Sequence, residues 1–196
     1  MQDFGLYFAL GREHILEWRG YDHMLFVAAL CGVYFFTDWR KVLVLVTAFT
    51  IGHSLTLVLS VLNWLILPSA WVEFLIPLTI VLTALSNLNT KAAQKQHMRW
   101  IYPMALFFGL IHGLGFSNYL KSLLGTDNSI VTQLLAFNLG LEFGQILIVV
   151  AILALAHLLV KQFKVPQREW VIFLSAATFG IAFIMAIERF LALQNV

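Results

Sequence analysis

Charged residues are scarce in this sequence of 196 residues. Asp, Glu, Lys and Arg make up 11% of the chain, whereas a soluble domain carries roughly 25%. Hydrophobic residues make up 61%. So few charges cannot cover a globule with polar surface, which excludes an ordinary soluble domain and indicates a lipid environment. The net charge of +2 and the lack of a dense basic run exclude nucleic acid as a partner.

Cysteine is nearly absent, since Cys31 is the only one in the sequence. A single cysteine excludes an internal disulfide and a metal centre built mainly from thiolates. The five methionines show no clustered pattern, which argues against a copper(I) pathway.

Long apolar stretches are the main feature that the sequence does contain. Because about 20 apolar residues cross a bilayer as a helix, these stretches predict an all-α polytopic bundle of about six transmembrane helices. The bundle would form a single transmembrane domain over residues 1–196. A helical start near Glu13 would lengthen the first stretch by two turns. The stretches are 21–36, 42–67, 71–88, 101–116, 130–160 and 170–191.

Basic residues separate the loops into two groups. Of the twelve Lys and Arg residues, eight fall in three alternate loops, which the positive-inside rule assigns to the cytoplasm. Both termini are then expected outside, and the protein is expected in the bacterial cytoplasmic membrane. The eight residues are Arg40, Lys41, Lys91, Lys95, Arg99, Lys161, Lys164 and Arg168.

Several histidines fall at membrane depth under this topology. His53 and His112 each lie eleven residues into an inside-to-outside stretch, at a depth of ~16 Å. Asp22 and His23 lie in the outer part of the first stretch, with His14 above them. We therefore expect a polar layer in the outer half or centre of the membrane, because buried ionisable residues mark functional sites.

The fifth stretch adds a carboxylate to this layer. Asn138, Glu142 and Gln145 are spaced i, i+4 and i+7, so they share one helix face. A carboxylate at the bilayer centre costs at least ~2.5 kcal/mol on insertion scales, so Glu142 needs a proton, a cation or a histidine as partner. Glu73 begins the third stretch at the outer face.

Two pairs of glycines accompany these polar residues. Gly109 and Gly113 flank His112, and Gly140 and Gly144 flank Glu142. Small residues let helix backbones approach closely. We expect them to place His112 and Glu142 on tightly packed helices.

Imidazole and carboxylate groups together form a ligand set for zinc, nickel, cobalt or Fe(II). We expect a divalent transition-metal ion (nickel, cobalt or zinc) as substrate or bound ion. Glu73, Asn138 and Gln145 would support the site as outer-shell residues. The candidate ligands are His14, Asp22, His23, His53, His112 and Glu142.

The motifs that carry these residues resemble those of the HupE/UreJ family of membrane proteins. The resemblance covers nearly the whole chain. It departs at Trp18 and Arg19, which add length between His14 and Gly20. The matching segments are 11–15 (GREHI), 20–26 (GYDHMLF), 45–57 (LVTAFTIGHSLTL), 72–77 (VEFLIP), 108–116 (FGLIHGLGF) and 137–145 (FNLGLEFGQ).

The resemblance implies nickel or cobalt uptake, in a family linked to supplying hydrogenase and urease. It also implies a metal-binding role for Asp22 and His23, since this pair resembles the signature of nickel/cobalt permeases. The protein would then be a transporter rather than an enzyme, with the lipid bilayer and the metal ion as its partners.

Two other functions remain open from the residues alone. Three histidines can hold zinc with an open water position, and Glu142 would then act as the base of an intramembrane hydrolase or protease. Paired histidines can also hold a b-type haem. The sequence leaves the oligomeric state open, including a homo-oligomer.

Overall fold

The computed structural model describes residues 2–88, 97–123 and 130–194, and every regular element within them is a helix. Five segments in these ranges are long and apolar enough to cross a membrane. The prediction of an all-α integral membrane bundle is confirmed. The five long helices are α3 (Trp39–Val61), α4 (Ser69–Leu88), α5 (His97–Leu123), α6 (Ile130–His157) and α7 (Gln167–Leu193).

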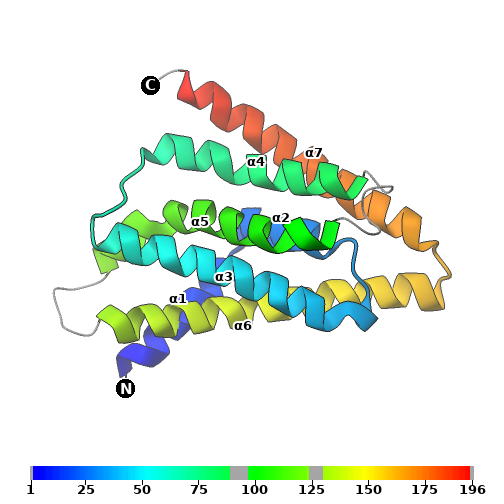
Figure 1. The fold of residues 1–196 in the computed structure, drawn as a ribbon, viewed down its shortest axis with the longest axis horizontal. Coiled ribbons are helices and arrows are strands. Elements are labelled where there is room, and N and C mark those ends of the chain that lie inside the picture. Colours follow the sequence, from blue (N-terminus) through cyan, green and yellow to red (C-terminus); the bar gives the residue numbers. More distant parts are fainter. Residues whose placement is uncertain (1, 89–96, 124–129, 195–196) are drawn as a thin grey trace.

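The first predicted crossing, 21–36, is not extended by a continuous helix from near Glu13, because two helices divide this part of the chain. The segment consists of α1 (Gln2–Leu16), the 3-10 turn η1 (Trp18–Gly20) and α2 (Asp22–Cys31). With 10 residues, α2 is ~15 Å long, about half of the ~30 Å hydrocarbon core. Together, α1 and α2 take the place of a sixth crossing (Figure 1).

Local backbone geometry explains this break. Glu17 has extended angles, φ −66° and ψ 122°, which end α1. Trp18, which belongs to the extra length of this segment, begins the single turn of η1. Gly20 closes the turn with a hydrogen bond of 3.2 Å from its N–H to the Glu17 carbonyl oxygen.

The other boundaries follow hydropathy closely. In the second stretch, α3 ends at Val61 rather than at Leu67, because Asn63 takes a positive φ of 59° that does not continue a helix. The fifth predicted stretch is unusually long because it contains α6 and runs into the π-helix η3 (Leu158–Gln162) that follows it. A further 3-10 turn, η2 (Phe36–Asp38), precedes α3.

The helices pack mainly in three pairs, α3 with α5, α1 with α6, and α4 with α7 (Figure 1). The short α2 lies inside the bundle, where it contacts α4, α6 and α7. Both chain ends lie at the end of the bundle that also carries the connection from α3 to α4 (Figure 1). Of the predicted basic residues, Lys91 and Lys95 lie outside the described residues.

Glycines set the closeness of two of these pairs. A Cβ added at Gly109 would collide with the Phe49 carbonyl on α3. A Cβ at Gly140 would collide in the same way with the Phe8 carbonyl on α1. The expected tight packing is therefore present, with His112 on the α3–α5 pair and Glu142 on the α1–α6 pair.

The buried histidines lie between two apolar clusters. One cluster includes Phe49 of α3 and Phe108 of α5, and the other includes Leu57 of α3 and Leu120 of α5. His53 falls between Phe49 and Leu57 along α3, and His112 lies between the corresponding residues of α5. The polar layer is thus closed on both sides by hydrophobic core.

Candidate metal centre

Three histidines from three helices converge in the centre of the bundle. His14, His23 and His53 each offer one ligand atom, and these atoms all lie within 4.8 Å of one another. Their ring centroids are 4.6 Å apart for His14 and His23, 5.9 Å for His14 and His53, and 6.1 Å for His23 and His53. We call these three residues the histidine cluster.

The helix break brings two members of the cluster together. His14 lies in the last turn of α1, and His23 is the second residue of α2. In one continuous helix the two side chains would lie far apart along the axis. The turn at η1 instead brings the end of α1 and the start of α2 to the same part of the bundle. Interrupted membrane helices commonly place their ends at substrate sites near the bilayer midplane.

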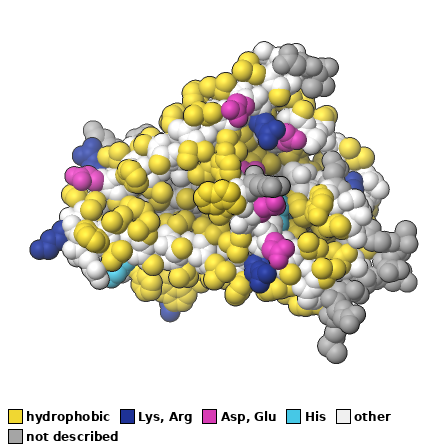
Figure 2. Space-filling model, turned by 180° about the vertical axis from the view of Figure 1, so that it is seen from behind, with side chains coloured by type: hydrophobic (Ala, Val, Ile, Leu, Met, Phe, Trp, Pro, Cys, Tyr) yellow, Lys and Arg dark blue, Asp and Glu magenta, His cyan; other side chains and the backbone are white. Residues whose placement is uncertain are grey.

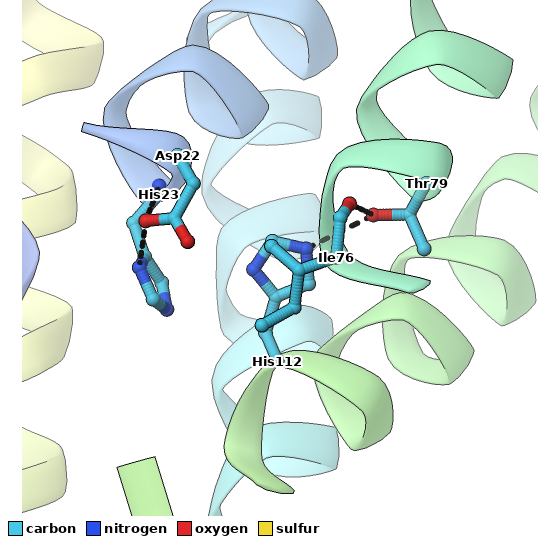
Figure 3. Close-up of polar contacts among 5 residues, drawn as sticks. All are labelled: Asp22, His23, Ile76, Thr79 and His112. Carbon is cyan, nitrogen blue, oxygen red and sulfur yellow. Dashed lines mark hydrogen bonds and ion pairs between the residues drawn. The ribbon is translucent and has the colours of Figure 1, made fainter. Parts of the chain in front are cut away.

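Asp22 determines which nitrogen of His23 is available. Its Oδ1 lies 2.9 Å from His23 Nδ1 and also accepts a hydrogen bond of 2.8 Å from the His23 backbone N–H (Figure 3). A carboxylate beside Nδ1 keeps the proton there, so Nε2 carries the lone pair. His23 Nε2 is buried and has no hydrogen-bond partner. Asp22 therefore orients a ligand and does not itself join the cluster.

His112 extends the cluster on the side of α4. Thr79 Oγ1 donates its one proton to the Ile76 carbonyl at 2.7 Å, so it must accept a hydrogen bond from His112 Nε2 at 2.9 Å (Figure 3). The free lone pair is thus on Nδ1, which is buried without a partner. The rings of His112 and His23 lie 5.1 Å apart.

The unpartnered nitrogens fit a metal ion. His14 Nε2, His23 Nε2 and both ring nitrogens of His53 are buried with no hydrogen bond. Each such group costs about 1–3 kcal/mol if nothing binds it, and burial of several together points to an absent ligand. Neutral imidazoles that converge from three sides suit zinc, nickel or cobalt.

Aromatic rings form a shell around these imidazoles. The Phe116 ring lies 4.0 Å from His14, and the Phe26 and Phe49 rings lie 4.9 Å and 5.2 Å from His112. This shell surrounds the imidazoles with apolar rings. These residues were not predicted from the sequence, although their spacing of three or four positions from a site histidine puts them on the same helix faces.

A surface depression leads to His14. It is lined by Leu10, Glu13, His14, Leu16, Glu17, Phe116 and Tyr119. Acidic side chains gather beside an exposed part of a histidine in the middle of this face (Figure 2). Arg12 pairs with Glu13 at 3.3 Å, so two carboxylates and one guanidinium leave a negative excess that suits the entry of a positively charged ion.

The polar residues of α6 are not members of the histidine cluster. Glu142 Oε1 accepts a hydrogen bond of 2.7 Å from Thr47, and Gln145 Oε1 lies 2.8 Å from Thr50 Oγ1. Asn138 lines a groove between the end of α3 and the start of α6. Neither threonine was identified from the sequence, because a threonine in an apolar helix gives no signal by itself.

Glu73 also has a partner of its own. Its Oε2 accepts a hydrogen bond of 2.8 Å from Arg189 of α7, and Ser69 donates to its other oxygen at 3.4 Å. Both charged side chains of the ion pair are about half exposed. Glu73 thus joins α4 to α7 near one end of the bundle.

Comparison with known protein families gives a match over nearly the whole chain. The family model described as HupE / UreJ protein matches residues 1–189, nearly the whole chain. The chain belongs to the HupE/UreJ family. No curated protein and no solved structure matches this HupE/UreJ chain.

The segments that resemble HupE/UreJ motifs meet at the site. Segment 11–15 supplies His14, segment 20–26 supplies Asp22 and His23, and segment 45–57 supplies His53. Family motifs that lie far apart in sequence therefore contribute to one centre in this HupE/UreJ protein.

Proposed function

We propose that this HupE/UreJ protein takes up a divalent transition-metal ion, nickel or cobalt, through the histidine cluster. The observation that carries the proposal is the convergence of three imidazole ligand atoms within 4.8 Å, from three helices, with buried nitrogens that lack partners. The family membership and the nickel or cobalt uptake that the resemblance implies support the same cargo.

A path for the ion follows from the positions of these groups. The ion enters at the depression, where Glu13 and Glu17 attract it, and reaches His14 at the inner wall. It then binds His23 and His53 and passes to Nδ1 of His112. Asp22 holds His23 in the tautomer that binds metal.

The direction of transport is inferred from charge. The basic residues at the start of α3 and between α6 and α7 favour a cytoplasmic position for that end of the bundle. Tyr119, near the outer end of α5, then forms the outer part of the depression at His14. Uptake across the bacterial cytoplasmic membrane is the direction that this orientation supports.

The hydrolase alternative gains no support from the site. It gave Glu142 the role of base, yet Glu142 accepts a hydrogen bond from Thr47 and is not among the residues whose ligand atoms lie within 4.8 Å of one another. We do not propose an enzymatic function.

Metal binding by purified protein tests the proposal directly. Calorimetric titration with nickel should give one site per chain in the wild type. His14→Ala and His53→Ala should each lower the affinity by more than the ~10–100-fold typical of losing an outer-shell partner. His157→Ala is the matched control, since this exposed histidine ends α6 away from the cluster.

Transport is measured with the same variants in proteoliposomes loaded with a nickel-sensitive dye. The two cluster variants should lose uptake and His157→Ala should retain it. Equal nickel affinity in all four proteins, or no affinity in any of them, would overturn the proposal.

A further inference from the structure

A second polar group joins α3 to α6, one helical turn from the histidine cluster. It consists of Thr47 and Thr50 on α3 and Glu142 and Gln145 on α6, and we call it the oxygen patch. Thr50 precedes His53 by three positions, so both lie on one face of α3. Nothing in the proposed metal path uses the side chains of the oxygen patch.

The two contacts cross each other. α3 and α6 run in opposite directions (Figure 1). Residues directly opposite each other on the two helices would therefore be Thr47 with Gln145 and Thr50 with Glu142. The structure instead pairs Thr47 with Glu142 at 2.7 Å and Thr50 with Gln145 at 2.8 Å. These contacts are the diagonals of one four-residue patch, and on each helix the two residues lie within about one turn of each other.

The hydrogen-bond network around Gln145 favours a reversed amide, because that orientation makes one more hydrogen bond. Thr50 Oγ1 lies 3.1 Å from the Val46 carbonyl and 2.8 Å from Gln145 Oε1, yet one hydroxyl proton cannot serve two acceptors. An amide's oxygen and nitrogen are assigned from the hydrogen-bond network. With the amide reversed, Nε2 donates to Thr50 and Thr50 donates to Val46.

The reversed amide leaves an oxygen without a donor. The unpartnered atom of Gln145 is buried, and the residue has 0% exposure. With the reversal, this atom is the carbonyl oxygen rather than Nε2. The oxygen patch then has a carboxylate, an amide oxygen and two hydroxyl oxygens, and its acceptors outnumber its donors. Such a group is stabilised by a bound cation or by a proton on the carboxylate.

We propose that the oxygen patch binds a sodium ion. Oxygen ligands suit hard cations, in contrast to the imidazoles of the histidine cluster. The single carboxylate of Glu142 balances one positive charge, whereas calcium sites usually have several carboxylates. Thr50 and His53 both belong to α3. Sodium bound to the patch and metal bound to the cluster would therefore both hold the position of this helix, which couples the two sites. This coupling role rests on the proposed transport function, whereas sodium binding does not.

Thermal unfolding in detergent tests the sodium site. Sodium chloride should raise the Tm of the wild type by several degrees relative to equal choline chloride, because a ligand that binds the folded state stabilises it. Glu142→Gln and Thr50→Val, which keep the side-chain shape, should lose this increase. Thr178→Val is the matched control, since Thr178 is a buried threonine on α7 that donates to a backbone carbonyl in the same way.

His53→Ala separates the two proposals. This variant should lose nickel binding and keep the sodium-dependent increase in Tm. A sodium effect in a wild type that binds no nickel would contradict only the proposed function. An increase that persists in Glu142→Gln and Thr50→Val, that potassium produces equally, or that acidification produces without sodium would overturn the sodium site.

Should Glu142→Gln fail to fold, Thr47→Val and Thr50→Val each remove one hydroxyl ligand and leave the carboxylate in place. Binding of radioactive sodium to the folded variants then gives a direct measurement. Wild-type affinity in both threonine variants would overturn the proposal.

Discussion

At the scale of single residues, the site depends on which nitrogen of each imidazole carries the proton. Asp22 sets this for His23, and Thr79 sets it for His112. The sequence identifies both histidines, because a polar residue in an apolar stretch is conspicuous. It does not identify Thr79 or Thr47, since threonine is common in membrane helices and its partner lies on another helix. Only tertiary packing reveals these pairs.

Replacing Asp22 with Asn should weaken nickel binding by ~10–100-fold. The amide can still accept a hydrogen bond, but it no longer favours the proton on His23 Nδ1, so the Nε2 lone pair is less available. Calorimetric titration measures the change. Asp38→Asn is the control, because Asp38 pairs with Lys41 beside the start of α3. Unchanged nickel affinity in Asp22→Asn would show that Asp22 does not orient His23.

Acid should weaken metal binding and uptake. Protons and nickel compete for the same ring nitrogens, because a protonated imidazole cannot bind metal. Nickel affinity should therefore be highest on the alkaline side and fall as the pH is lowered. Nickel titrations at matched ionic strength measure the fall, and a flat profile would count against histidine ligands.

At the scale of the helices, hydropathy predicts α3 to α7 because each helix is long and apolar, but it misses the end of α3 by six residues and the end of α5 by seven. It does not predict the break between α1 and α2, since averaging over about 20 residues conceals one turn of 3-10 helix. The glycines predict that some helices pack closely. They do not predict which helix each glycine contacts, because the sequence pattern contains no information on the neighbouring helix.

Gly140 and Gly180 provide a matched test of close packing. A Cβ at Gly140 would collide with the Phe8 carbonyl of α1, whereas a Cβ at Gly180 of α7 meets nothing within 4 Å. Gly140→Ala should reduce the free energy of unfolding by about 1–3 kcal/mol. Gly180→Ala should not reduce it, because alanine favours helix by up to ~1 kcal/mol over glycine. Unfolding in mixed micelles measures both, and equal stability of the two variants would contradict the close α1–α6 contact.

At the scale of the whole molecule, both chain ends lie at one end of the bundle, as the loop charges predict (Figure 1). The side of the membrane on which that end lies stays a prediction. The charge pattern implies that it is the outer side. This orientation also determines whether the depression at His14 accepts ions from outside the cell.

Cysteine labelling in intact cells tests the orientation. Cys31 is buried, and its replacement by alanine gives a background without cysteine. In that background, Ser69→Cys at the start of α4 should react with a membrane-impermeant maleimide. Gln167→Cys at the start of α7 should react only after the cells are permeabilised. Both positions are exposed. The reverse pattern would place the termini inside.

The broken first crossing also affects how the protein is made. Because α2 is ~15 Å long and begins with Asp22 and His23, it is a poor substrate for insertion into lipid on its own. We expect α2 to reach its buried position only after the long helices are in the bilayer and can surround it. His14 and His23 would then meet His53 in the last step of assembly. Metal affinity would therefore also report that the newly made chain has finished folding.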